Sequence, residues 1–357
     1  MDEQEEHTRK ETLLVFNCHE PWVYQLGVLG FKLDIIIGLK GRYTATWDEQ
    51  MRPLPAHSRL ITMAEALRSP KCYYCIITHN IADLMDVKCR PEPRIIVLHS
   101  SLEGRVGEER PKVAPESLKK MLHEYLELIG GHAVATSMFK GESWGFTEDI
   151  VPFGVDPDEY LPYSGEKACG LRICNFIESR KKILLWDFHK KAFDGIPVRL
   201  VGHNPNMPGA AAADNWEHLK KILRSSRFYI HTADPRFEAG HNMATAEAMA
   251  AGLPVLGNRH PTSPIKHGVS GFLSDDPDQL RKYAKMLLAD RELAVLMGRQ
   301  AQKIVKKHFS PERFRMSFLR SVEIARQKWK DRSAELGGIQ AGFLARTARL
   351  AAAPGAG

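Results

Sequence analysis

Residues 227–276 decide the fold of this chain, and they read RFYIHTADPRFEAGHNMATAEAMAAGLPVLGNRHPTSPIKHGVSGFLSDD. An apolar run opens the stretch and predicts a buried strand that ends near Thr232. A polar loop containing Gly240 follows, and a helix rich in small residues is expected to begin near Asn242. A Gly-containing loop between the carboxyl end of a strand and a helix N-terminus is typical of anion sites in α/β folds. The alternative is a plain loop whose neighbouring Glu247 is solvated.

The same alternation of strand and helix patterns extends outward in both directions. Short apolar runs predict buried strands in two groups. The runs of the first group lie at 12–17, 32–38, 75–80, 94–99, 132–137 and 148–154. Those of the second lie at 172–177, 197–203, 227–233, 253–258 and 271–274. Because helix-like stretches separate the runs, the sequence predicts two α/β halves, each built on a parallel sheet covered on both faces.

Composition divides the chain into six segments. They are expected to be a disordered tail, a first α/β domain, a linker rich in Pro, Gly and acids, a second α/β domain, a helix and a disordered low-complexity tail. In that order the segments span residues 1–11, 12–156, 157–170, 171–310, 311–336 and 337–357. With 43% hydrophobic and 26% charged residues, both domains can build a core.

The net charge of +7 is concentrated near the C-terminus. Residues 299–349 carry 13 Lys and Arg against four Asp and Glu, so the rest of the chain is slightly acidic. This segment is interpreted as a surface helix with a solvated basic face, or as a peripheral contact with an anionic membrane surface. A nucleic-acid partner is not expected, because no basic and aromatic recognition module accompanies the charge.

Several protein classes are excluded by composition. No apolar run approaches the roughly 18 residues of a membrane-spanning helix. The polar start MDEQEEHTRKE is unlike a secretory signal, so we expect a cytoplasmic chain, or one at the inner membrane face. Cys72 and Cys75 have CxxC spacing, but they enter a strand without a second pair, so no zinc or redox site is expected there.

Two segments of the chain resemble the retaining GT-B glycosyltransferases, in particular their large family four. That family has an acidic residue, a Gly-rich turn, a Glu-Ala-Met-Ala-x-Gly-x-Pro-Val segment and a downstream Gly-x-x-Gly-Phe. The corresponding parts here are Glu238, 240–243, 247–255 and 268–272. Upstream, residues 132–162 (HAVATSMFKGESWGFTEDIVPFGVDPDEYLP) are similar to the segment that ends the family's N-terminal domain.

The resemblance implies a GT-B fold, in which two Rossmann-like domains face each other across a cleft and the helix over 311–336 crosses back to the first domain. It also implies transfer of a sugar from a nucleotide-sugar to an unknown acceptor with retention of anomeric configuration, without a metal or cofactor. The alternatives are a catalytically silent GT-B scaffold, a GT-B epimerase or phosphorylase, and a nucleic-acid binder that uses the basic segment.

The donor-binding residues implied by the resemblance lie in the opening stretch. Glu247 is expected to bind the ribose, and Glu238 the hydroxyls of the donor sugar in a catalytic role. The amides of Gly240, His241, Asn242 and Met243 are expected against the sugar and the diphosphate. The family has seven residues between its two glutamates, whereas eight lie between Glu238 and Glu247 here. Glu238 therefore serves only if the loop shifts by one residue, and Asp234 is a weaker substitute.

Cations are also expected at the donor diphosphate. A leaving diphosphate needs positive charge when no metal supplies it. Arg180 and Lys182, which follow the first strand of the second domain, resemble the basic pair of the family, and Lys266 matches a loop near the diphosphate. The expected Arg position nearer Asn175 is not basic. The alternative for the pair is a solvated helix start.

Residues of the first half are assigned to the other side of the cleft. His99 ends a strand in RIIVLHSS and resembles the His that reaches the donor sugar, where it would orient the sugar and bind no metal. His19, Glu20 and Trp22 replace the family's Gly-Gly turn. They either contact the acceptor or form a packed turn, and the polar loop over 38–53 has the same two interpretations. The DDPD run at 275–278 is interpreted as a helix N-cap.

Overall fold

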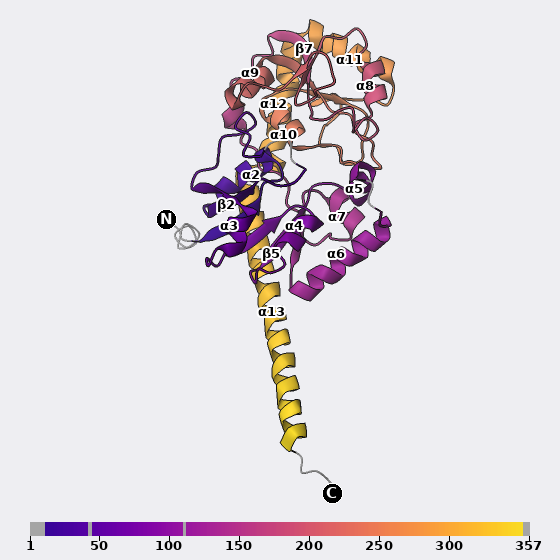
Figure 1. The fold of residues 1–357 in the computed structure, drawn as a ribbon. Coiled ribbons are helices and arrows are strands. Elements are labelled where there is room, and N and C mark those ends of the chain that lie inside the picture. The colour runs from indigo at the N-terminus through magenta and orange to yellow at the C-terminus, as the bar shows by residue number, and fades with distance from the viewer. Residues whose placement is uncertain (1–10, 42–44, 110–111, 353–357) are drawn as a thin grey trace.

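The computed structural model describes residues 11–41, 45–109 and 112–352, and it contains two α/β domains (Figure 1). The first domain holds a parallel sheet in the order β3-β2-β1-β4-β5-β6. Its strands are β1 (Thr12–Phe16), β2 (Lys32–Ile37), β3 (Ser58–Thr62), β4 (Cys75–Thr78), β5 (Arg94–Leu98) and β6 (His132–Ala135). The run at 148–154 forms only an isolated bridge from Ile150 to Ala135, because Pro152 and Gly154 interrupt it.

The helices of the first domain are short except for one. They are α2 (Glu20–Tyr24), η1 (Gln25–Leu29), α3 (Met63–Arg68), α4 (Ile81–Asp86), α5 (Leu102–Glu109), α6 (Pro115–Ile129) and α7 (Met138–Trp144), followed by η2 (Pro157–Tyr160). The local sequence explains where these helices begin and end. Thr62 and Glu65 form a reciprocal capping box at the start of α3, and Gly130 ends α6 in a left-handed conformation with φ 61°.

The second domain repeats this architecture with a sheet in the order β12-β11-β10-β7-β8-β9. Its strands are β7 (Lys167–Ile173), β8 (Val198–Val201), β9 (Ala210–Ala211), β10 (Ser226–Ile230), β11 (Val255–Gly257) and β12 (Gly271–Leu273). Its helices are α8 (Trp186–Ala192), α9 (Trp216–Ser225), α10 (Met243–Ala250), α11 (Pro277–Ala289) and α12 (Arg291–His308). Asp276 caps α11 by accepting the backbone N–H of Asp278.

The last helix, α13 (Pro311–Ala352), follows the second domain in sequence but packs on the first. Phe318, Val322 and Ala325 on this helix are fully buried where it covers β4, β5 and β6. The structure differs from the disordered tail expected from residue 337. The helix continues to Ala352, since Ala, Arg and Leu favour helix beyond Gly337 and Gly338. Figure 1 shows its last part, in yellow, projecting away from both domains.

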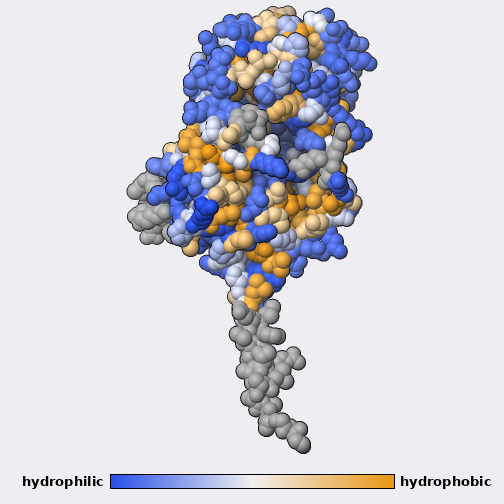
Figure 2. Space-filling view, viewed as in Figure 1, coloured by the Kyte–Doolittle hydropathy of each residue, from blue (hydrophilic) through white to orange (hydrophobic). Residues whose placement is uncertain are grey.

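The surface view places apolar residues where the two domains meet. Figure 2 shows orange patches at this level of the molecule and others lower down, over the first domain. Among the described residues, no helix combines the length and apolar character that a bilayer crossing requires.

Candidate active site between the two domains

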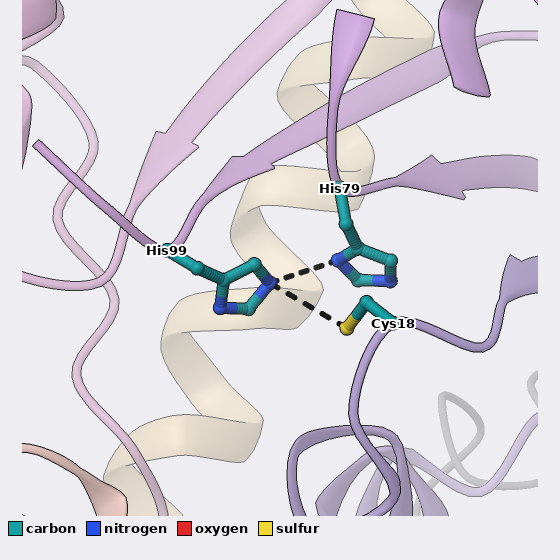
Figure 3. A group of neighbouring side chains, drawn as sticks. All are labelled: Cys18, His79 and His99. Atoms are coloured by element: carbon teal, nitrogen blue, oxygen red, sulfur yellow. Dashed lines mark hydrogen bonds between the residues drawn. The ribbon is translucent and has the colours of Figure 1, made fainter. Parts of the chain in front are cut away.

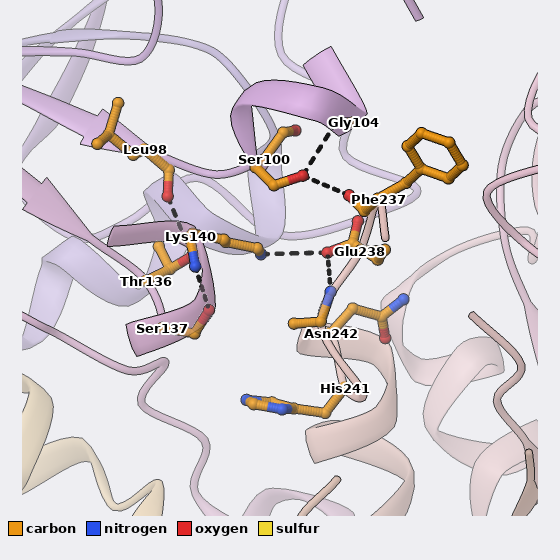
Figure 4. Close-up of polar contacts among 12 residues, drawn as sticks. Leu98, Ser100, Gly104, Thr136, Ser137, Lys140, Phe237, Glu238, His241 and Asn242 are labelled. Carbon is orange, nitrogen blue, oxygen red and sulfur yellow. Dashed lines mark hydrogen bonds and ion pairs between the residues drawn. The ribbon is translucent and has the colours of Figure 1, made fainter. Parts of the chain in front are cut away.

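Two cations from opposite domains converge on Glu238. This residue lies in the loop that connects β10 to α10. Its Oε1 is 3.6 Å from the Nζ of Lys140 on α7, and its Oε2 is 3.8 Å from Nη2 of Arg180 in the loop after β7. Figure 4 shows Lys140 and Glu238 pointing toward each other across the domain boundary. Lys140 is only 3% exposed, so its charge acts in a largely water-excluded setting.

Further contacts hold the same edges of the domains together. Arg180 donates from Nε to Glu108 Oε1 of α5 at 2.7 Å. The Ser101 hydroxyl donates to the carbonyl oxygen of Phe237 at 2.5 Å and accepts the backbone N–H of Gly104 at 3.0 Å. The cleft is therefore narrow at Glu238, with the start of α5 resting on the β10–α10 loop.

The predicted Gly-rich turn lies at the N-terminus of α10. Gly240 donates its N–H to Thr262 Oγ1 at 2.9 Å, and a Cβ at this position would lie 2.7 Å from His260 Nδ1. Only glycine fits this close approach. The Asn242 side chain caps α10 by accepting the N–H of Thr245 at 2.9 Å. The backbone of residues 240–243 thus forms the entry to a helix that begins in the cleft.

The His241 side chain packs among aromatic rings. Its ring centre is 5.3 Å from that of Phe309 and 6.3 Å from that of Phe153. Burial, with a smaller effect of the Lys140 charge, lowers the pKa of His241 to about 4. The side chain is therefore neutral at pH 7, and Met243 in the next turn is also buried.

The second predicted glutamate, Glu247, forms an ion pair with Arg52 of the first domain. Arg52 is 2% exposed, and its guanidinium lies 3.6 Å from the centre of the Trp216 ring. Burial lowers the pKa of Arg52 below its usual range. The Trp47 ring donates to the carbonyl oxygen of Arg52 at 2.7 Å, which fixes the loop that delivers it.

A cavity of about 300 Å³ lies beside this pair. Both domains, the linker between them and the start of α13 contribute to its walls. Its lining includes Tyr24, Gln25, Arg52, Gly154, Tyr160, Met243, Glu247 and Phe314. The cavity has the volume of a small-molecule site and combines apolar walls with a few polar groups, as such sites do.

The other predicted cations lie farther from Glu238. Lys182 is exposed, and its Nζ is 4.8 Å from the centre of the Phe237 ring. Lys266 is exposed. Burial lowers the pKa of His308 at the end of α12, and the charges of Lys307, Arg313 and Lys266 add smaller effects in the same direction. Asp234, the weaker substitute for Glu238, is paired with Arg236 at 2.6 Å.

The residues assigned to the acceptor side are mostly packed. Trp22 is 2% exposed, and its ring meets His79 and His99 edge-on. Glu20 is fully buried and accepts a hydrogen bond from Asn17 Nδ2 at 2.9 Å. The packed-turn alternative therefore describes Glu20 and Trp22, whereas His19 is exposed at the start of α2.

His99 lies at the carboxyl end of β5 and is partly buried. Its Nε2 is 2.9 Å from His79 Nδ1. Burial lowers the pKa of His99 well below its usual range, and the neighbouring His79 and Lys140 act in the same direction. The imidazole is neutral at pH 7, so it offers hydrogen bonds rather than charge.

Sequence reasoning missed Arg52, Glu108 and Lys140. Lys140 carried a detectable signal, because a cation in the first turn of a helix opposes the helix dipole unless it has another partner. Arg52 lies in the polar loop over 38–53 that the sequence did single out, but nothing in the loop pointed to Glu247. Glu108 carried no signal that separates it from other surface glutamates.

Comparison with protein families supplies the class of protein. Residues 198–290 match the family model described as glycosyl transferases, group 1. They include both glutamates and the turn between them, so the match confirms the predicted enzyme class, a glycosyltransferase. No curated protein matches the sequence of this chain.

Solved structures share the fold at low identity. HepE of Anabaena, in complex with UDP and glucose, is 12% identical with a TM-score of 0.62, over 88% of this chain and 99% of that one. A glycosyltransferase of Rickettsia africae ESF-5 is 14% identical with a TM-score of 0.60, over 90% and 99%. Sucrose-phosphate synthase of Thermosynechococcus elongatus is 13% identical with a TM-score of 0.58, over 94% and 100%. These likenesses confirm the expected GT-B fold.

Proposed function

We propose that this chain moves a sugar from a nucleoside diphosphate sugar to an acceptor hydroxyl, with retention of anomeric configuration and no metal ion at the diphosphate. The observation that carries the proposal is the convergence of Lys140 and Arg180 on Glu238 near the N-terminal end of α10. A carboxylate for sugar hydroxyls and cations for phosphate charge thus occupy one place between the domains.

The diphosphate is assigned to the N-terminus of α10 and the cations around it. The backbone from Gly240 to Met243 opens the helix, where N–H groups favour an anion. Arg180 and Lys140 neutralise the charge that develops on the departing phosphate, and this effect is strongest in a site shielded from water. Lys182, at the surface beside Phe237, adds a cation at the entrance.

In the proposed reaction, the bond between the sugar C1 and the β-phosphate oxygen breaks. A bond between C1 and the acceptor oxygen forms on the same face of the sugar. The acceptor proton passes to an oxygen of the leaving diphosphate, so no side chain has to act as a covalent nucleophile. Glu238 and His99 hold the donor sugar by hydrogen bonds, and closure of the domains excludes water.

Glu247 is assigned to the ribose hydroxyls, which it can bind while it remains paired with Arg52. In the structure its carboxylate is paired with Arg52. A ribose hydroxyl that donates to one carboxylate oxygen leaves the other oxygen for Arg52, because a carboxylate offers about four acceptor positions. HepE is bound to UDP-glucose in one solved structure, which supports a nucleotide-sugar as the ligand class for a chain of this fold.

One observation favours a second candidate, the catalytically silent scaffold. Both glutamates already have cationic partners from the first domain, Lys140 for Glu238 and Arg52 for Glu247. If these pairs are permanent, they lock the domains together and leave no carboxylate for a donor. A test must therefore measure donor binding and turnover separately.

The test is a panel of UDP-, GDP- and ADP-sugars, with thermal shift for binding and release of nucleoside diphosphate for donor hydrolysis. We expect one base to raise the unfolding midpoint and one sugar to be hydrolysed slowly. Glu247→Ala is expected to abolish the shift, whereas Glu217→Ala, on the exposed side of α9, leaves it unchanged. If the chain shows no binding and no turnover with any donor, the result supports the scaffold and refutes the transferase. Binding with turnover refutes the scaffold.

A further inference from the structure

Three side chains with metal-ligating atoms meet at one edge of the first sheet. Cys18 follows β1, His79 follows β4 and His99 follows β5. Figure 3 shows the thiol and both imidazoles pointing toward one another. Their ligand atoms all lie within 4.8 Å of one another. The positions are 61 and 20 residues apart in sequence, so only the fold brings them together.

Two of the three separations between the ligand atoms are close to those of a tetrahedral zinc site, and the third is no longer than 4.8 Å. Zinc binds thiolate sulfur at about 2.3 Å and imidazole nitrogen at about 2.0 Å, so two ligand atoms on one ion lie roughly 3.3 to 3.7 Å apart. Here His79 Nδ1 and His99 Nε2 are 2.9 Å apart, and Cys18 Sγ and His99 Nε2 are 3.8 Å apart. Side-chain movements of a few tenths of an ångström bring both of these separations into that range.

The backbone holds these residues on rigid elements. β1, β4 and β5 are adjacent parallel strands, so their carboxyl ends lie at the same edge of the sheet. The N–H of His79 donates to Asp83 Oδ2 at 2.9 Å, which fixes the turn that carries this residue. The Trp22 ring covers both imidazoles edge-on, with centre distances of 4.8 and 5.0 Å. A ligand set held in this way loses little freedom when an ion binds.

We propose that Cys18, His79 and His99 form a binding site for Zn²⁺, with the fourth position open to water or to an atom of a bound ligand. One thiolate and two imidazoles are the donors that zinc prefers, and three protein ligands with one open position are typical of reactive zinc sites. The metal displaces the thiol proton on binding and the hydrogen bond between the two imidazoles. This site is separate from the cations assigned to the diphosphate.

Some charges around the cluster disfavour the binding of a dication, and others favour it. Lys140, His19 and Arg105 act electrostatically on His99 and disfavour a dication. The Cys18 thiolate cancels one unit of the zinc charge, and Glu238 lies against Lys140 at 3.6 Å.

Such a site would control the reaction, although this consequence rests on the proposed function. Zinc bound at Nε2 occupies that nitrogen of His99, so it can no longer form a hydrogen bond with the donor sugar. Zinc is therefore expected to inhibit transfer, and a chelator to restore it. Direct metal binding does not depend on that consequence, so the two are measured separately.

The experiment uses the full chain, treated with chelator under reducing conditions and titrated with CoCl₂ as a spectroscopic substitute for zinc. We expect one Co²⁺ per chain and a thiolate-to-cobalt charge-transfer band, which one equivalent of ZnCl₂ removes. Cys18→Ser is expected to lose the band and bind at least tenfold more weakly, while His79→Gln binds at least tenfold more weakly. Cys72→Ser, at an exposed cysteine, is the matched control and keeps both.

The result that overturns the site is the absence of stoichiometric binding, or a band that persists in Cys18→Ser or disappears in Cys72→Ser. Circular dichroism checks that each variant is folded, and His79→Gln carries the test if Cys18→Ser does not fold. Donor hydrolysis is then measured with and without ZnCl₂. A chain that binds cobalt as described but never hydrolyses a donor retains the metal site and refutes the proposed function.

Discussion

At the scale of single residues, the ion pair between Arg52 and Glu247 is a buried contact that ties the two domains together. Both side chains are nearly fully buried, with 3% and 6% exposure. Arg52→Met leaves a buried carboxylate without its cation, and we expect the free energy of unfolding to fall by about 3–5 kcal/mol. Urea denaturation followed by fluorescence measures this loss.

The control for this prediction is Lys190→Met, because Lys190 pairs with Asp187 on the surface at 2.8 Å. An exposed pair contributes about 1 kcal/mol or less. The double variant Arg52→Met/Glu247→Leu is expected to recover most of the loss, since neither charge is then left unpaired. A loss no larger than the control, or no recovery in the double variant, contradicts the role given to the pair.

Buried histidines predict how the stability of the second domain depends on pH. Burial lowers the pKa of His189 to about 2, of His231 to about 3 and of His241 to about 4. The unfolded chain binds these protons at its ordinary pKa of about 6.5, so it holds more protons than the folded chain at pH 5. Stability is therefore full above about pH 6.5 and is lost as pH falls toward 4.

Near pH 5 the three groups together contribute a slope of roughly 4 kcal/mol per pH unit. The measurement is the unfolding midpoint of the full chain between pH 7.5 and 5, with His231→Gln as the informative variant. Removal of one titrating group is expected to reduce the slope by about a third. A midpoint that stays constant over this range shows that the histidines are not held neutral.

The predictable part of the site at this scale is its acidic half. Glu238 and Glu247 were singled out because the short stretch that contains them resembles a family motif, which is a local pattern. Their partners Lys140 and Arg52 were not, since each comes from the other domain and becomes a neighbour only after folding. The cluster of Cys18, His79 and His99 lies within the first domain, but it was missed because β1, β4 and β5 become neighbours only after folding.

At the scale of elements, α10 is positioned by a close approach of α12. A Cβ on Gly298 of α12 would lie 1.8 Å from the carbonyl oxygen of Gly252, just after α10. Gly298→Ala must push the two elements apart, and we expect a loss of about 1–3 kcal/mol together with weaker donor binding through Glu247. Thermal unfolding and the nucleotide-sugar shift measure the two effects.

Gly107→Ala is the matched control, because the space around a Cβ on Gly107 in α5 is open. Alanine favours helix over glycine by about 1 kcal/mol, so this variant should be unchanged or more stable. If Gly298→Ala behaves like Gly107→Ala, the packing of α12 does not position α10.

The sequence predicted most elements correctly where the apolar periodicity and the turn-forming residues agree, as in β10, α10 and β11. It predicted a strand at 148–154 that the structure does not form, because an apolar run alone does not reveal whether a neighbour offers hydrogen bonds. It also missed β3, whose SRLIT sequence has an exposed side typical of an edge strand. Whether an apolar run pairs as a strand depends on the neighbouring strands of the sheet, and the sequence of the run alone does not reveal them.

At the scale of the whole molecule, α13 joins the C-terminal end of the chain to the first domain. Trp329 Nε1 donates to the carbonyl oxygen of Pro91 at 2.5 Å, and Arg332 Nε donates to that of Leu128 at 3.1 Å. The domains are thus connected by this helix as well as by the linker and the cleft contacts. If the two domains close around a ligand, the packing of α13 against β5 and β6 has to be preserved.

Truncation separates the packed part of α13 from its projecting part. A chain that ends at residue 336 keeps Phe318, Val322 and both hydrogen bonds, so its stability is expected within about 0.5 kcal/mol of the full chain. A chain that ends at residue 313 loses Phe314, Phe318 and Val322, all at most 2% exposed. Each lost aromatic costs about 3–5 kcal/mol, and the sum approaches the whole stability of a domain, about 5–15 kcal/mol. Limited proteolysis should then digest the first domain while the second resists, and equal resistance of both would show that the first domain holds its fold without the helix.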